Sequence, residues 1–194
     1  MTALSSIYEF GFCLEVKNGT KWFLDPYSSY EHSGQISSPP GCIWPGERGT
    51  LIAHKAGVYG QPATYGVSGV VSWKFKDKSI KLALMYNLPH DQDGAGQKNK
   101  IALGLFPASV VGKNCMKEVY FKLLDAAENH PGENLSYKTG SFQGVKAGEV
   151  IQYATNGLEI IGTIGSGDVC DIKVDVRPKL GQDAAPNLRE LFLV

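Results

Sequence analysis

Residues 65–106 read YGVSGVVSWKFKDKSIKLALMYNLPHDQDGAGQKNKIALGLF, and this stretch decides the fold. Apolar side chains recur at every second position in three successive runs, at 67–75, 80–86 and 101–105. A period of two is typical of a strand that buries one face and exposes the other. The stretch therefore predicts three consecutive strands of an antiparallel sheet with one packed face.

A polar, glycine-rich loop at 87–98 separates the second run from the third. It is longer than a hairpin connection needs, and long loops on a rigid sheet are often places where ligands bind. We therefore expect recognition at this end of the sheet.

The flanking sequence continues the same pattern. Alternation at 10–17 and the dipeptide Asn18-Gly19 predict a hairpin whose partner strand is 20–24. Residues 26–45 are rich in Pro, Ser and Gly, which indicates irregular chain with at most a short edge strand near 35–37. Further strands are predicted at 49–55, 149–155, 158–164 and 170–177.

One segment carries a helical pattern. An apolar stripe runs from Met116 to Ala127 at helical spacing, Asn114 is a reasonable cap, and Asn129 to Gly132 should end the helix. The sequence therefore predicts a mainly β protein: an antiparallel β-sandwich of about 10–12 strands flanked by one main helix at about 114–128. Residues 2–8 leave room for a short N-terminal helix of one or two turns.

The chain length suggests one domain at 1–180 followed by a tail at 181–194. The tail is polar at first and then apolar. Its pattern fits either a short amphipathic helix or a disordered end.

Bulk composition excludes some partners. Nineteen basic and nineteen acidic side chains give zero formal net charge, which argues against nucleic acid as a partner. The first ten residues lack a basic start and a long apolar run, so no signal peptide is visible. We expect a cytoplasmic protein by default, with a secreted, membrane-associated active form as the alternative.

The reactive side chains form no recognisable centre in the sequence. The four cysteines, Cys13, Cys42, Cys115 and Cys170, are widely spaced and lack metal-ligand spacing, so we expect no metal and no cofactor. The four histidines are scattered, and no nucleophile-elbow serine motif is present. A catalytic triad can still converge in space, but we expect that the protein is not an enzyme.

Several short motifs, in order, resemble the actinoporin-like family of pore-forming cytolysins known from sea anemones. The motifs are NGTKW at 18–22, YEHSG at 30–34, WPG at 44–46, TYGVSGV at 64–70, LALMYNLPHD at 82–91 and MKEVYF at 116–121. The resemblance implies a β-sandwich flanked by two helices. It also implies binding of phosphocholine headgroups, membrane insertion of an aromatic cluster, and a pore lined by an N-terminal helix.

The same resemblance assigns candidate headgroup-binding residues. Ser33 and Pro89 match pocket positions, Asn87 replaces a serine, and Phe121, beside Tyr120, stands where a tyrosine is expected. Lys117 and Lys122 replace tyrosines of the family pattern, and lysine would repel a quaternary ammonium.

Two departures affect the membrane-active parts of the family pattern. Residues 92–100 contain no aromatic side chain that could anchor the loop at a lipid interface. About ten residues precede the first strand, too few at ~1.5 Å per residue to cross a ~30 Å bilayer core as a helix.

Two functions remain open from the sequence. In the first, the protein is a membrane-binding, pore-forming relative that recognises lipid headgroups and self-associates or uses a partner chain on the membrane. In the second, it is a lectin-like carbohydrate-binding module on the same sandwich, without lytic activity. Candidate glycan or interface residues are aromatic side chains in or near loops: Tyr27, Tyr30, Trp44 and Tyr65.

Overall fold

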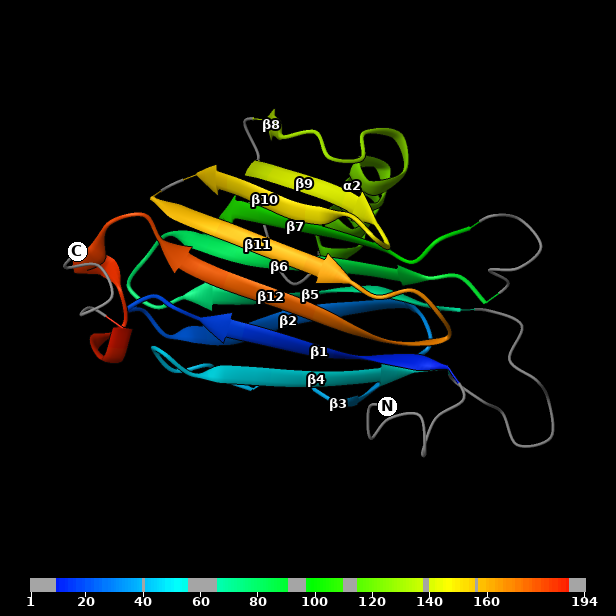
Figure 1. The fold of residues 1–194 in the computed structure, drawn as a ribbon, viewed down its shortest axis with the longest axis horizontal. Coiled ribbons are helices and arrows are strands. Elements are labelled where there is room, and N and C mark those ends of the chain that lie inside the picture. The colour runs from blue at the N-terminus through cyan, green and yellow to red at the C-terminus, as the bar shows by residue number, and fades with distance from the viewer. Residues whose placement is uncertain are drawn as a thin grey trace.

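Two six-stranded sheets face each other in the computed structural model, and one helix packs on the second sheet (Figure 1). The structure describes residues 10–39, 41–55, 66–90, 97–109, 115–137, 140–155 and 157–188, without the side chains of Tyr27 and Tyr137. The described helices are α2 (Met116–Asn129) and the short 3-10 helix η3 (Gly181–Asp183). The strands are β1 (Gly11–Asn18), β2 (Leu24–Ser33), β3 (Gln35–Ser38), β4 (Arg48–His54), β5 (Val67–Phe75), β6 (Ile80–Leu88), β7 (Lys100–Pro107), β8 (Leu135–Tyr137), β9 (Gly140–Lys146), β10 (Val150–Thr155), β11 (Leu158–Ile164) and β12 (Val169–Pro178).

The first sheet has the strand order β10-β11-β12-β1-β4-β3, and the second has the order β2-β5-β6-β7-β9-β8. The predicted fold class, a mainly β sandwich with one main helix, is therefore confirmed. One strand pair differs from the predicted antiparallel arrangement, because β1 and β12 run parallel. These strands are distant in sequence, so no tight hairpin forces them to be antiparallel. The predicted short N-terminal helix lies outside the described residues.

The main core fills the space between the two sheets. Phe12, Leu14 and Leu51 come from the first sheet, and Trp73 and Leu84 come from the second; all are buried. Removing each such side chain from water stabilises the fold by roughly 1.5–3 kcal/mol. This core fixes the relative position of the two sheets.

A second core lies between the second sheet and α2. Val70, Met85 and Ala102 point from the sheet toward Tyr120 and Leu123 of the helix, and all five are buried. The prediction of one packed face was therefore wrong for β5, β6 and β7, which are covered on both faces. Alternation in the sequence could not reveal this, because small or polar residues such as serine and alanine line much of the helix-facing side.

The main helix has nearly the predicted extent. It begins at Met116, with Cys115 at the N-cap position and no side-chain cap hydrogen bond, and it ends at Asn129. Asn114, the predicted cap, lies outside the described residues. Among the described helices, none combines the length and the apolar character that a bilayer-spanning segment needs.

The predicted hairpin at Asn18-Gly19 was wrong. β1 pairs with β4 and β12 in the first sheet, whereas β2 pairs with β5 in the second. Instead of turning a hairpin, the buried Asn18 side chain holds the crossover between sheets. Its amide donates to the carbonyls of Trp22 (2.7 Å), Ile43 (3.2 Å) and Trp44 (3.3 Å), and its oxygen accepts from the Thr20 hydroxyl (2.7 Å).

The interpretation of 26–45 as mostly irregular was also wrong, because β2 is a ten-residue strand. It lies at the edge of the second sheet and changes register between Pro26 and Ser28. An edge strand tolerates proline there because one of its sides has no ladder partner. The three-residue strand β8 and the seven-residue strand β9 were not predicted either.

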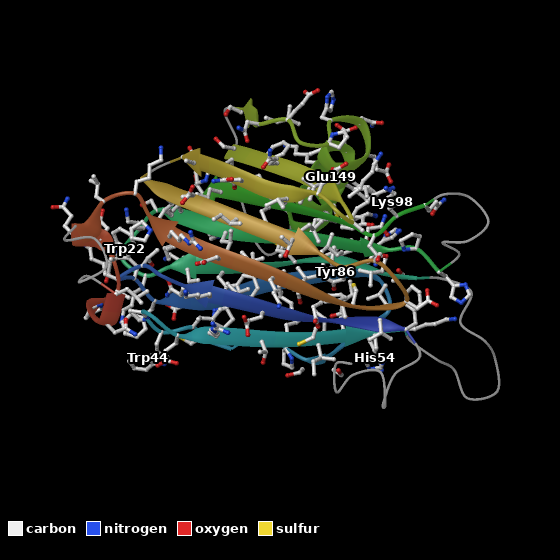
Figure 2. The ribbon with its side chains drawn as sticks, viewed as in Figure 1. Trp22, Trp44, His54, Tyr86, Lys98 and Glu149 are labelled. Atoms are coloured by element: carbon white, nitrogen blue, oxygen red, sulfur yellow. The ribbon has the colours of Figure 1, made fainter. Side chains whose placement is uncertain are left out.

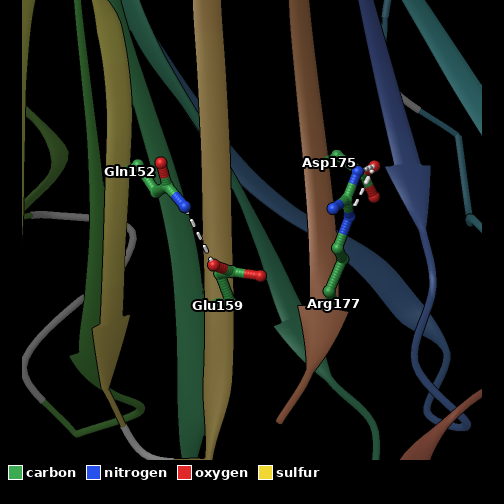
Figure 3. A network of polar contacts seen from close by, with 4 residues as sticks. All are labelled: Gln152, Glu159, Asp175 and Arg177. Carbon is green, nitrogen blue, oxygen red and sulfur yellow. Dashed lines mark hydrogen bonds and ion pairs between the residues drawn. The ribbon is translucent and has the colours of Figure 1, made fainter. Parts of the chain in front are cut away.

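The outer face of the first sheet carries polar side chains (Figure 3). Gln152 on β10 donates to Glu159 on β11 at 3.2 Å, and Arg177 on β12 donates to Asp175 at 2.7 and 2.9 Å. The helix α2 lies on the other sheet, so it does not cover these groups.

The described part of the predicted tail packs on the crossover between β1 and β2. The Asp183 carbonyl accepts from the Lys21 amide at 2.8 Å, and the Asp183 carboxylate pairs with the Lys21 ammonium at 2.7 Å. Ala184 and Ala185 are buried. The predicted division of the chain at residue 180 stays a prediction.

Candidate functional site

Three polar side chains lie in a row where β2, β5 and β6 meet the loop end of the second sheet. Ser33 is opposite Ser68, and Ser68 is opposite Asn87. Directly opposite residues of neighbouring strands point to the same face of a sheet, here the face that α2 covers. The Ser33 hydroxyl donates to the Gly66 carbonyl at 2.8 Å and lies 2.8 Å from the Ser68 hydroxyl.

A bulge in β2 adds an aromatic ring beside these hydroxyls. The register of β2 shifts between Glu31 and Ser33, so His32 is the extra residue. Bulges often redirect a side chain, and here the His32 ring stacks on Tyr120 of α2 with centroids 5.1 Å apart. His32 also meets the ring of Phe121 edge-on at 5.8 Å.

Tyr30 completes the aromatic part. Its ring lies 5.8 Å from Tyr120, and its hydroxyl is 3.4 Å from His32 Nδ1. Phe121 meets Tyr120 edge-on at 5.1 Å and leaves 45% of its surface exposed. We call the seven residues the aromatic–hydroxyl site: Tyr30, His32, Ser33, Ser68, Asn87, Tyr120 and Phe121.

The Tyr120 hydroxyl of the site is partly shielded from water, which keeps it protonated. Burial raises the pKa of the Tyr120 hydroxyl above its ordinary value, the hydrogen bond with Ser68 offsets part of that rise, and Glu128 and Tyr30 add to it. In the core between the two sheets, burial also raises the pKa of Tyr86, with a further rise from Glu31. Both hydroxyls are therefore protonated at neutral pH, and that of Tyr120 can donate a hydrogen bond within the site.

The structure brings together most of the residues that the sequence nominated. Ser33, Asn87, Tyr120 and Phe121 belong to the aromatic–hydroxyl site, and so does Tyr30, which was nominated for glycan or interface contact. Pro89 lies next to it, because a Cβ atom on Gly66 would be only 3.0 Å from the amide nitrogen of His90, the residue after Pro89.

The other nominated residues lie elsewhere or outside the description. Trp44 is at the opposite end of the sandwich, near the start of β2 (Figure 2). Tyr27 lies in β2, but its side chain is not described, and Tyr65 lies outside the described residues.

Sequence reasoning missed two members of the site. Ser68 stood out only as a polar residue within a strand, although a serine facing a helix needs a hydrogen-bond partner and is therefore worth attention. His32 lies inside the YEHSG motif two residues after Tyr30, so alternation along β2 places it on the same face as Tyr30 and places Ser33 on the other face. Only the bulge brings both side chains to α2.

The described residues gather no group of three or more His, Cys, Asp and Glu side chains that could hold a metal ion. The serines bond to each other and to a backbone carbonyl. Hydroxyls, one amide and aromatic faces can hold a polar ligand that has an apolar or cationic part.

Comparison with known proteins gives a likeness among solved structures. No protein-family model matches the sequence, and no curated protein matches it significantly. Among solved structures, the chain is similar to "lipid binding protein Nakanori", with a TM-score of 0.65 and 14% sequence identity. The match covers 90% of this chain and 74% of that one. The likeness shows a shared fold.

Proposed function

We propose that this protein binds the phospholipid headgroups of a membrane through the aromatic–hydroxyl site. One observation carries the proposal: two serine hydroxyls, an asparagine and four aromatic rings from β2, β5, β6 and α2 converge at one end of the second sheet. The fold likeness to a protein described as lipid-binding supports it, and so does the resemblance to the actinoporin-like family.

The chemistry of the site suits the two parts of a headgroup. The asparagine amide can donate to phosphate oxygens, the serine oxygens can accept from a primary ammonium, and the faces of Tyr30 and Phe121 can hold an ammonium group. Lys117 and Glu118 precede Phe121 by four and three residues, which are neighbouring positions on a helix surface, and both are exposed. Charges of both signs beside Phe121 favour a zwitterionic headgroup.

Membrane assembly is the finer part of the proposal. We propose, from the family resemblance, that bound molecules self-associate and open the bilayer. The N-terminal residues that would take part, 1–9, lie outside the described residues. Release of an encapsulated dye from vesicles tests this step separately from binding. We also propose that the protein acts without catalysing a reaction, because the site offers ligand-binding groups.

A sedimentation assay tests the proposal. The purified protein is mixed with vesicles of phosphocholine, phosphoethanolamine, phosphoserine or phosphoglycerol lipids, and the pelleted fraction is measured. We expect pelleting with the zwitterionic lipids, and soluble phosphocholine or phosphoethanolamine should compete with it. Absence of binding to every composition would overturn the proposal; binding without dye release would remove only pore formation.

The lectin-like alternative is favoured by one observation, the exposed ring of Trp44. That ring lies at the other end of the molecule, so sugar binding there would accompany lipid binding without competing for the same residues.

A further inference from the structure

A second cluster of aromatic rings lies at the end of the sandwich opposite to the aromatic–hydroxyl site. Phe23 immediately precedes β2, whereas Ser33 ends it, and the ten residues of β2 span roughly 30 Å. Figure 2 shows Trp22 and Trp44 at the left end and His54 at the right. Gly34, the residue after Ser33, lies beside His54 at the right end, because a Cβ atom on Gly34 would be 2.9 Å from the His54 carbonyl oxygen. One flat membrane cannot contact both ends at the same time.

Trp44 is the most exposed large apolar side chain among the described residues, with 60% of its surface accessible. Its position is nevertheless fixed. The Phe23 ring meets it edge-on at 4.5 Å, and its carbonyl accepts hydrogen bonds from the Asn18 amide at 3.3 Å and the Glu47 backbone at 3.0 Å. A rigid aromatic ring loses little conformational entropy when a ligand stacks on it.

Two lysines lie over neighbouring aromatic rings of this cluster. The Lys76 ammonium lies 5.2 Å from the centre of the Phe23 ring, and the Lys78 ammonium lies 3.8 Å from that of Trp22. Among the described residues neither lysine forms an ion pair with a carboxylate, whereas Lys21 is paired with Asp183. Asp25, at the start of β2, offers carboxylate oxygens near the same ring system, where it accepts from Cys42.

An exposed indole ring with lysine and carboxylate side chains nearby suits the binding of a sugar better than contact with a membrane. A pyranose ring presents C–H groups on one face, which can stack on an indole, and hydroxyls at its edge, which can both donate and accept hydrogen bonds. Lys76 and Lys78 supply donors, and Asp25 supplies an acceptor.

Charge argues in the same direction. Lys21 is paired with Asp183, and Asp77 lies between Lys76 and Lys78 in the sequence, so carboxylates accompany the lysines beside these rings. These carboxylates reduce the electrostatic attraction of an anionic bilayer or a nucleic acid to the lysines.

We propose that Trp44, with Phe23, Lys76, Lys78 and Asp25, forms a saccharide-binding site in which a sugar ring stacks on the Trp44 indole. The site is independent of the aromatic–hydroxyl site. A protein with both sites can hold a membrane lipid at one end and a glycan at the other.

A glycan array probed with the wild-type protein and with Trp44→Ala tests this. We expect wild-type binding to a defined set of saccharides, loss of affinity by about tenfold or more in Trp44→Ala, and partial retention in Trp44→Phe. Val150→Ala is the matched control, because Val150 is similarly exposed at 54% and lies on β10. Its glycan binding should equal that of the wild type. Melting curves check that each variant is folded.

Vesicle sedimentation with the same variants separates this proposal from the proposed function. Glycan binding that needs Trp44, together with unchanged vesicle binding in Trp44→Ala, supports the site whether or not lipid binding occurs at the other end. An empty array overturns it. Loss of vesicle binding in Trp44→Ala also overturns it, because this end would then be the membrane-facing one.

Discussion

The contact between α2 and β9 depends on Gly144, and an alanine there should weaken both the fold and the site. A Cβ atom on Gly144 would lie 2.5 Å from Ala127 Cα and 2.7 Å from the Ala126 carbonyl carbon. Ordinary carbon contacts need about 3.5–4.0 Å. Both neighbours are helix backbone, which cannot rotate away as a side chain can, so α2 must move by about 1 Å or the strand must bend.

Overpacking of this kind typically costs 1–3 kcal/mol and sometimes more. Because the obstacle is backbone, we expect Gly144→Ala to lower the free energy of unfolding by about 3 kcal/mol. For a chain of this size that corresponds to a fall in melting temperature of roughly 6–12 °C. Since α2 carries Tyr120 and Phe121, vesicle binding should weaken as well.

Urea denaturation followed by tryptophan fluorescence measures the change. Gly41→Ala is the matched control, because a Cβ atom on Gly41 would meet nothing within 4 Å. It should leave stability within about 0.5 kcal/mol of the wild type. A Gly144→Ala protein as stable as the Gly41→Ala protein would refute the packing of α2 on β9.

Two further predictions concern buried polar groups. Asn18→Ala should destabilise the fold by about 2–3 kcal/mol, because the carbonyls of Trp22 and Ile43 lose their donor; a change below 0.5 kcal/mol in urea denaturation would contradict this. Burial, with a smaller contribution from Asp171, raises the pKa of Cys170 from 9.0 to about 12, and the hydrogen bond with Asn99 offsets part of that rise. The folded state thus holds the thiol proton more tightly than the unfolded state, so this stabilising contribution is complete below pH 9 and is lost as the pH rises toward 12. Between pH 8.5 and 10.5 the free energy of unfolding of the wild type should therefore fall by about 2 kcal/mol more than that of Cys170→Ala. An equal fall in both proteins over this pH range would contradict the reasoning.

The regular strands and the helix could be predicted because their patterns are local. The run 67–75 alternates, and the stripe from Met116 to Ala127 repeats at helical spacing, so each pattern indicates its own structure without tertiary information. The crossover at Asn18 could not be predicted in this way. The same Asn-Gly dipeptide suits a hairpin, and only the distant carbonyls of Ile43 and Trp44 explain why Asn18 is buried.

The site was predicted in part for a similar reason. Ser33, Asn87 and Phe121 were found through resemblance to family motifs, because their nearness depends on three strands and a helix meeting at one end of a sheet. The nearness of His32 and Ser33 on one face requires the bulge in β2, which no alternation pattern shows. Ser68 requires knowledge that α2 covers β5. Both are consequences of tertiary packing.

The central claim, that the aromatic–hydroxyl site holds a lipid headgroup, is tested most directly by vesicle binding of Phe121→Ala beside Val150→Ala. Both changes remove an exposed apolar side chain, but only Phe121 belongs to the site. Burying a phenylalanine against a ligand is worth roughly 1.5–3 kcal/mol. The account predicts that Phe121→Ala weakens binding to zwitterionic vesicles by at least about tenfold while Val150→Ala binds as the wild type does. Equal binding by the two variants would contradict it.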